Sequence, residues 1–260
     1  VWRASLICSS PWSWVFSAIV DVARGIRNAD GLAKGERRED LREYPCRMAK
    51  FLFRCVLYDI KGRKMLTPQR KATHISKTDT PRRFVFLLLY QFTMLSFACA
   101  IEPLRLANLV MGYPVYRWSL AGEGGKEAIC SNGASFRLDM GLDEVDREDM
   151  LMVCGGVDIQ RSTTRAVVGW LRRESRRGVT IGGMCTGAYA LAKAGLLDGK
   201  KATIHWENQD GFLEEFEDVR LTKSVFVVDG NRMTTAGGTS SIDLMLKIIA
   251  NDLGEDTANN

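Results

Sequence analysis

The pentapeptide Gly183-Met184-Cys185-Thr186-Gly187 joins two segments of different character. The short apolar run 179–181 before it is typical of a buried strand, and the alanine-rich stretch 188–194 after it predicts a helix that Gly195 ends. A cysteine between a strand and a helix, with a glycine two positions away on each side, has the pattern of a nucleophile elbow. We therefore expect Cys185 at the carboxyl edge of a sheet, where a helix N-terminus favours the thiolate. An ordinary strand–helix turn around a buried cysteine gives the same pattern.

Apolar runs alternate with amphipathic stretches from residue 84 onward. The continuous apolar run 84–89 is typical of a parallel strand that is buried on both faces. The same reasoning predicts strands at 116–121, 150–153, 202–204, 226–228 and 233–235, and helices at 95–110, 163–177, 209–216 and 240–253. This alternation predicts an α/β fold: a doubly wound, mostly parallel sheet with helices on both faces.

Charge divides the chain unevenly. Residues 1–83 hold 18 Lys and Arg against 8 Asp and Glu, whereas residues 84–260 hold 18 against 23. Residues 1–80 show no sustained periodicity, so we interpret 1–64 as a basic leader outside the native protein, with Met65 as the native start and 65–83 as a flexible arm. The uncharged stretch 4–20 is interrupted by serine and proline and is short for a membrane span, so neither a signal peptide nor a membrane anchor is expected.

The seven cysteines show neither CxxC spacing nor histidine partners. This pattern argues against a disulfide framework and against a zinc site, and it favours the reducing cytoplasm. We expect no metal and no cofactor. The exposed face of the expected helix 163–177 carries an arginine cluster, which we interpret as a solvated face and not as a DNA contact; its members are Arg172, Arg173, Arg176 and Arg177.

Two further features accompany the elbow. Gly155-Gly156 follows the strand expected at 150–153, where its backbone N–H groups are placed to face a bound oxygen, although a plain glycine turn explains the pair equally well. His205 follows the strand expected at 202–204, at the edge where doubly wound folds bind ligands. A lone histidine can also be purely structural.

Together these residues resemble the PfpI/ThiJ-like superfamily, relatives of the class I glutamine amidotransferases, over about 84–253. In that superfamily an elbow cysteine follows a strand, a Gly-Gly pair ends the preceding strand, and a histidine stands one strand later. Cys185, Gly155-Gly156 and His205 occupy those positions. The resemblance implies a flavodoxin-like, class I glutamine amidotransferase-like fold.

The departures from the superfamily bear on catalysis. Its enzymes usually carry an acidic residue on the first helix-forming loop, but 91–97 contains no carboxylate and the nearest equivalent position holds Ser96. Thr186 stands where the peptidase-like members have a histidine, and Glu102 is offset from the family position. A nucleophilic thiol needs an oriented base, and His205 has no evident carboxylate to orient it. The sequence therefore predicts a non-catalytic relative of cysteine hydrolases.

A particular branch is resembled more closely: the N-terminal domains of GlxA-like transcriptional regulators of the AraC family. The resemblance rests on the segments 95–108, 183–189, 203–207 and 235–238. It implies that 84–253 is a ligand-sensing domain, that 254–260 is the stub of a linker, and that DNA is bound only through a helix-turn-helix domain absent from this chain. It also implies a cytoplasmic homodimer with no membrane partner.

The branch implies a small effector, which we expect to be an amino-acid-like or quaternary-amine metabolite related to carnitine, betaine or arginine. The residues expected to bind it are Ser96, Gly155, Gly156, Cys185, Thr186, Tyr189, His205 and Trp206. The aromatic residues Tyr90, Phe92, Tyr189 and Trp206 are candidates to enclose a cation, with core packing as their alternative role.

Two other functions stay open. The chain can be a cysteine-dependent PfpI-like hydrolase, hydratase or deglycase in which Cys185 and His205 are catalytic. Alternatively, oxidation of Cys185 can serve as a redox signal, although no resolving cysteine is identifiable from the sequence.

Overall fold

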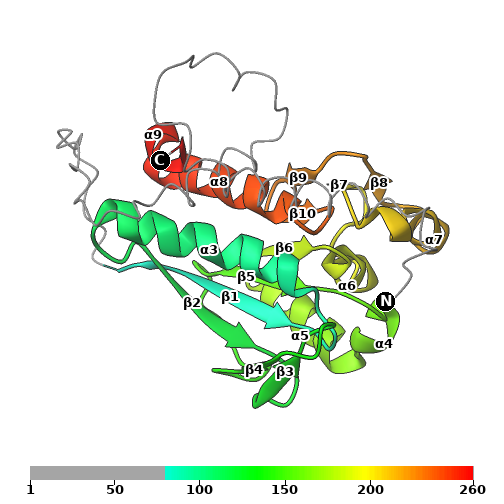
Figure 1. The fold of residues 1–260 in the computed structure, drawn as a ribbon. Coiled ribbons are helices and arrows are strands. Elements are labelled where there is room, and N and C mark those ends of the chain that lie inside the picture. The colour runs from blue at the N-terminus through cyan, green and yellow to red at the C-terminus, as the bar shows by residue number, and fades with distance from the viewer. Residues whose placement is uncertain (1–79, 260) are drawn as a thin grey trace, which may run out of the picture. The chain divides into compact units, whose positions relative to one another are not determined.

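The structure is a computed structural model that describes residues 80–259, all of which belong to one compact unit (Figure 1). The expected leader, 1–64, and most of the expected arm, 65–83, lie outside the described residues, so those assignments stay predictions. The first strand begins at Arg82, two residues before the expected start. At the other end, a short helix, α9 (Glu255–Asn259), occupies most of the segment 254–260.

The centre of the fold is a six-stranded sheet with the order β2-β1-β5-β6-β10-β9. All neighbouring strands are parallel except the hairpin of β9 and β10. The bounds are β1 (Arg82–Leu88), β2 (Tyr116–Ala121), β5 (Met150–Cys154), β6 (Thr180–Met184), β9 (Phe226–Asp229) and β10 (Arg232–Thr235). The mostly parallel sheet confirms the fold predicted from the sequence.

The strand register aligns the ends of four strands in one row. Leu88 of β1 pairs with Cys154 of β5, Cys154 with Met184 of β6, and Met184 with Thr235 of β10. The residues that follow these strands therefore lie at one edge of the sheet, as the carboxyl ends of parallel strands do. This register brings the Gly-Gly pair, the elbow cysteine and the glycines after β10 together.

Helices cover both faces of the sheet, which completes the doubly wound architecture. α3 (Met94–Met111) and α8 (Ser240–Leu253) lie against each other over one face, as Figure 1 shows. α5 (Arg165–Arg176) and α6 (Gly187–Lys193) pack with the opposite core. Alternate residues of a strand serve the two cores: Phe84 and Phe86 point to the first, and Val85 and Leu87 point to the second.

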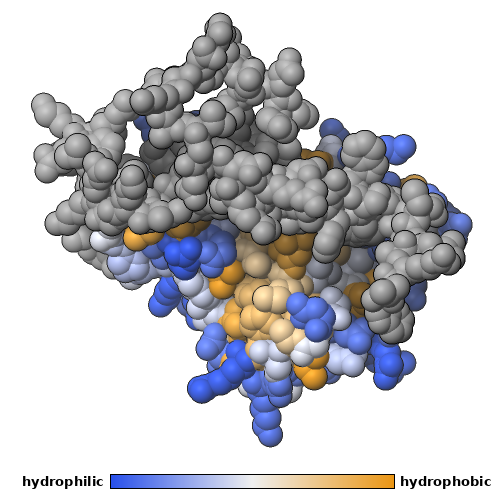
Figure 2. All heavy atoms as spheres, viewed as in Figure 1, coloured by the Kyte–Doolittle hydropathy of each residue, from blue (hydrophilic) through white to orange (hydrophobic). Residues whose placement is uncertain are grey.

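Among the described residues, α3 is the one helix that is long and apolar enough to cross a membrane by length and composition. Here it is a core helix, because Phe97, Ala100 and Leu104 are buried in the core that it shares with α8. Its outer side carries the Glu102–Arg105 ion pair beside exposed apolar side chains. Figure 2, drawn in the same view as Figure 1, shows an apolar area on the side of the molecule where α3 lies.

The expected strand 202–204 is not part of the central sheet. Only Lys201–Ala202 forms a strand, β7, and it pairs with β8 (Arg220–Leu221) in a separate two-stranded sheet. Beyond it, the Thr203 N–H donates to the hydroxyl of Thr234 at 2.8 Å, where a strand would use a backbone carbonyl. A side chain thus substitutes for a neighbouring strand, and apolar periodicity does not reveal this. A second small sheet joins β3 (Glu127–Ile129) to β4 (Ser135–Arg137).

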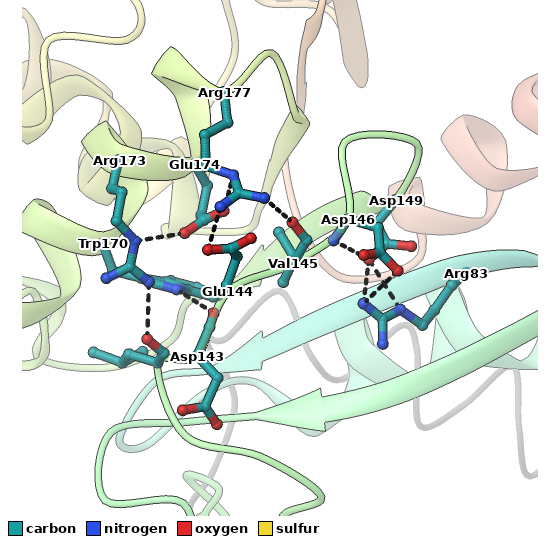
Figure 3. A network of polar contacts seen from close by, with 11 residues as sticks. Arg83, Asp143, Glu144, Val145, Asp146, Asp149, Trp170, Arg173, Glu174 and Arg177 are labelled. Atoms are coloured by element: carbon teal, nitrogen blue, oxygen red, sulfur yellow. Dashed lines mark hydrogen bonds and ion pairs between the residues drawn. The ribbon is translucent and has the colours of Figure 1, made fainter.

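Two arginines, Arg173 at the end of α5 and Arg177 just after it, hold the chain that precedes β5 (Figure 3). Arg177 pairs with Glu144 and donates to the Val145 carbonyl, and Arg173 donates to the Leu142 carbonyl at 3.1 Å. Arg172, on the same helix, donates to the Ala194 carbonyl. Arg172, Arg173 and Arg176 are exposed, as expected for a solvated face, and the bonds of Arg173 and Arg177 in addition hold the loop before β5.

The same loop is fixed at its other end by Arg83 of β1. Arg83 donates through Nε and Nη2 to one carboxylate oxygen of Asp149, and that oxygen also accepts the Asp146 N–H. The Asp149 side chain is 5% exposed, whereas that of Asp146 is 69% exposed. Figure 3 shows both acids facing Arg83. Asp149, the buried acid, should therefore contribute more to the stability of the fold than the exposed Asp146.

We expect Asp149→Asn to lower the free energy of unfolding by about 2 kcal/mol, because it removes the buried counter-ion of Arg83 and leaves the guanidinium only the exposed carboxylate of Asp146. Asp146→Asn makes the same change at an exposed position and should cost less than about 1 kcal/mol. Urea denaturation at neutral pH measures both values. Equal losses in the two variants would contradict this assignment.

Candidate functional site

Cys185 occupies a strained turn between β6 and α6. Its φ is +59°, a left-handed conformation that non-glycine residues rarely adopt. A Cβ on Gly183 would lie 2.7 Å from the Ala188 nitrogen, and one on Gly187 would lie 2.2 Å from the Val153 carbonyl oxygen. Both glycines are therefore required by close backbone approach. The nucleophile-elbow geometry expected from the pentapeptide is present.

The Gly155-Gly156 pair is also explained by close approach. A Cβ on Gly155 would lie 2.4 Å from the Gly187 nitrogen, and one on Gly156 would lie 2.0 Å from the Gln91 oxygen. The Gly155 N–H donates to the Met184 carbonyl at 3.2 Å, so it does not face a bound oxygen as the oxyanion-hole interpretation required. The Gly156 carbonyl accepts the Thr186 hydroxyl at 2.8 Å. This bond ties the pair to the elbow.

Hydroxyl groups and a glycine surround the Cys185 thiol, which is 4% exposed. The Thr93 hydroxyl lies 3.7 Å from the sulfur and makes no capping bond to α3, which begins at the next residue. Gly237 lies on the other side, where a Cβ would approach the sulfur to 2.9 Å. Ser96 is fully buried nearby, where its hydroxyl accepts the Gly238 N–H at 2.7 Å. The thiol is thus enclosed by α3, the elbow and the loop before α8.

Burial raises the pKa of the Cys185 thiol above its ordinary value. Hydrogen bonds from Thr93, from the Thr186 backbone and from Ser96 lower the pKa, while the Glu207 carboxylate raises it further. The net direction is upward. The Thr186 backbone at the N-terminal end of α6 does favour the thiolate, as expected, but desolvation by burial outweighs this contribution.

We expect the pH dependence of Cys185 alkylation to show a pKa above that of an unperturbed cysteine. Thr93→Val should raise it further, because it removes a hydroxyl that stabilises the thiolate. Iodoacetamide labelling, quantified on the Cys185 peptide by mass spectrometry, measures both. Thr257→Val, a distant change of the same kind, is the control and should leave the pKa unchanged. A pKa below the ordinary range would contradict the burial argument.

A cavity of about 470 Å³ opens beside the thiol. Its walls come from Thr93, the segment 156–160, the start of α6, and the segment 204–215. The last segment contains the 3₁₀ turn η2 (Trp206–Asn208) and α7 (Gln209–Glu215), and the segment 156–160 leads into α4 (Ile159–Ser162). The expected binding residues that line the cavity are Gly156, Cys185, Thr186, Tyr189 and His205.

Three expected binding residues do not line the cavity. Ser96 lies behind the thiol, and both backbone groups of Gly155 are used, since its carbonyl accepts the Thr93 N–H at 3.1 Å. Trp206 is 70% exposed on the outside of the wall. For Ser96 and Gly155 the structure supports a role in holding the thiol's surroundings.

The expected aromatic enclosure is mostly absent. Phe92 is fully buried and makes edge contacts with Phe97 and Phe136, with ring centroids 5.8 and 5.5 Å away, so its role is core packing. Tyr90, like Trp206, is exposed and does not line the cavity. The aromatic residues that do line it are Tyr189 and Phe212.

His205 lies in the cavity wall with a carboxylate beside it. Its Nδ1 is 3.7 Å from an oxygen of Glu207, a partner that the sequence analysis missed although it is only two residues away. Among the described residues, no hydrogen bond joins His205 to the Cys185 thiol. Glu102, the acid that the sequence places nearest the family's acidic position on this helix, pairs with Arg105 on the outside of α3.

Carboxylates are the charged groups of the cavity. Asp158, Glu207 and Glu215 line it, and no lysine or arginine of the described chain does. No sequence pattern indicates this grouping, because Asp158 lies about 50 residues before Glu207 and Glu215 in the chain. Their association depends on how 204–215 folds back over the elbow.

The model of the DJ-1/PfpI family matches residues 82–251, which include the whole central sheet and the elbow. The chain belongs to this family. This confirms the superfamily resemblance and the fold class inferred from the sequence.

Regulators are prominent among the relatives. The chain is 45% identical over 175 residues to the HTH-type transcriptional regulator CdhR of Pseudomonas aeruginosa, which covers 67% of this chain and 52% of that protein. It is 39% identical over 188 residues to the HTH-type transcriptional regulator GlxA of Rhizobium meliloti, which covers 70% of this chain and 57% of that protein. The domain is thus GlxA-like, as its motifs indicated, and the chain spans about half the length of these regulators.

A solved structure supports the same grouping. An AraC family transcriptional regulator from Pseudomonas putida superposes with a TM-score of 0.62 at 27% identity, over 68% of this chain and 96% of that one. A shorter match, 32% identical over 111 residues, is to an isonitrile hydratase of Pseudomonas putida and covers 42% of this chain and 48% of the enzyme. The family therefore contains both regulators and enzymes.

Proposed function

We propose that residues 84–253 form the effector-binding domain of an AraC-family transcriptional regulator. The domain senses a small amino-acid-like or quaternary-amine metabolite and controls transcription through a helix-turn-helix domain outside the matched region. The observation that carries this proposal is a cavity of about 470 Å³ next to a thiol whose pKa is raised by burial. This volume suits a small metabolite, and a protonated thiol offers a contact surface without a nucleophile.

The surroundings of Cys185 support binding without catalysis. The side chains that hydrogen-bond to the thiol are the hydroxyls of Thr93 and Ser96, which cannot act as a base at neutral pH. His205 lies in the same cavity but makes no bond to the sulfur among the described residues. A nucleophilic mechanism needs a base in contact with the thiol, so this arrangement favours a sensor.

A cysteine enzyme is the second candidate. The observation in its favour is the neighbouring pair of His205 and Glu207, which supplies the carboxylate that the sequence analysis found missing. A hydrolase, hydratase or deglycase would use Cys185 as the nucleophile and His205 as the base. Such an enzyme requires the histidine to reach the sulfur when substrate binds.

A regulator that reads paired DNA half-sites acts as a symmetric dimer. We therefore include a homodimer in the proposal, in the cytoplasm and without a membrane partner. The apolar side chains exposed along α3, which include Leu95, Leu109 and Val110, offer a surface for such an interface.

We expect zwitterionic and cationic metabolites to raise the thermal midpoint of the protein, because a ligand that binds only the folded state stabilises it. The panel comprises glycine betaine, carnitine, arginine and proline, with acetate and glycerol as small controls that lack the cationic group. A rise that grows with ligand concentration, seen with at least one zwitterion and with neither control, supports the proposal. No shift from any zwitterion would contradict the proposed class of effector.

A further inference from the structure

We propose that the cavity beside Cys185 selects cations and that Glu215 of α7 is the residue that determines this selectivity. The inference deepens the proposed function, because it names the ligand group that the cavity recognises and the side chain that recognises it. It rests on the charges that line the cavity, and Glu215 lies outside the four segments that carry the family resemblance.

Apart from the ionisable His205, the charged side chains that line the cavity are carboxylates. Asp158, Glu207 and Glu215 each contribute a carboxylate, and no lysine or arginine of the described residues lines the wall. In a recess with low-dielectric walls, such a set raises the local concentration of cations and lowers that of anions. A ligand with a positive group is therefore favoured at this position.

Glu215 is held in place by two hydrogen bonds, whereas Glu207 has, among the described residues, a single 3.7 Å contact with His205. One carboxylate oxygen accepts hydrogen bonds from the Tyr189 hydroxyl at 2.9 Å and from the Lys193 ammonium at 2.7 Å. Its side chain is 33% exposed, whereas that of Glu207 is 63% exposed and closer to bulk solvent. A held, partly shielded charge acts more strongly on a ligand than a solvated one. Tyr189 lines the cavity as well, so an aromatic ring lies next to the carboxylate.

Lys193 opposes the field of Glu215. It sits on α6, its side chain is 50% exposed, and it does not line the cavity. Its ammonium group, 2.7 Å from a carboxylate oxygen of Glu215, offsets part of that negative charge. Removing Lys193 should therefore make the cavity more selective for cations, and removing the charge of Glu215 should make it less so.

Cys185 provides a built-in reporter of this field. Methanethiosulfonate reagents react when the thiolate attacks their sulfenyl sulfur, which forms a mixed disulfide and releases methanesulfinate. The test compares the trimethylammonium-ethyl reagent, which is cationic, with the sulfonato-ethyl reagent, which is anionic. Rates at Cys185 are measured in the full chain at low ionic strength by mass spectrometry of the Cys185 peptide. Both reagents meet the same thiol pKa and the same general accessibility, so these two factors cancel in the ratio of the rates.

We expect the cationic reagent to be favoured in the unmodified protein by about tenfold relative to its preference for a free cysteine peptide. Glu215→Gln should lower the ratio about fivefold, as expected for the loss of one charge from the wall of a partly solvated site. Glu214→Gln makes the same change at the neighbouring exposed residue and should leave the ratio within about twofold. Lys193→Met should raise the ratio.

Three results would overturn the inference: an unchanged ratio in Glu215→Gln, an equal fall in Glu214→Gln, or failure of the cationic reagent to reach Cys185 in the folded protein. Circular dichroism checks that each variant folds. If Glu215→Gln does not fold, Lys193→Met tests the same field in the opposite direction. The experiment needs no effector. If the cavity prefers the cationic reagent but no metabolite of the panel binds, only the proposed effector class is refuted. If a metabolite binds but the cavity shows no such preference, only this inference is refuted.

Discussion

The close approach of four backbone segments around Cys185 is the constraint on which the rest of the site depends. Gly155, Gly183, Gly187 and Gly237 each lie where a Cβ would come within 3 Å of a neighbouring atom. Their missing side chains let β5, β6, α6 and the loop before α8 converge, and the convergence holds Cys185 at a positive φ. The strand register aligns the same segments at one edge of the sheet. The glycines, the strand register and the position of the thiol are thus all linked through the turn that holds Cys185.

This convergence also determines the chemistry of the thiol. Packing that tight removes water from the sulfur and raises its pKa, and the groups that face it are hydroxyls and a glycine. A carboxylate or an imidazole in contact with the sulfur would change the balance. The acids of the site instead line the cavity away from these contacts, at Asp158, Glu207 and Glu215. The geometry of a nucleophile elbow is therefore retained in a site whose polar groups are better arranged to recognise a ligand than to transform one.

Local patterns predicted most of this fold. The apolar runs at 84–89 and 150–153 and the helix at 240–253 appear nearly as expected, because hydrophobic periodicity reports which faces are buried. The segment after Ala202 was mispredicted, because a bond to the Thr234 side chain replaces a neighbouring strand. Of the site, the elbow and His205 were predictable from motif and order along the chain. Glu215 and Phe212 were not, because only the path of 204–215 brings them to the cavity.

The central claim is that the thiol at the elbow contacts a ligand and does not react with it. Isothermal titration of the tightest zwitterion from the panel into the unmodified protein and into Cys185→Ala tests this claim most directly, with NMR of the same mixtures to follow the ligand. The account predicts that the dissociation constant changes by less than about tenfold, the loss of one buried contact, and that the ligand stays chemically unchanged in both. Conversion of the ligand by the unmodified protein that disappears in Cys185→Ala would contradict it.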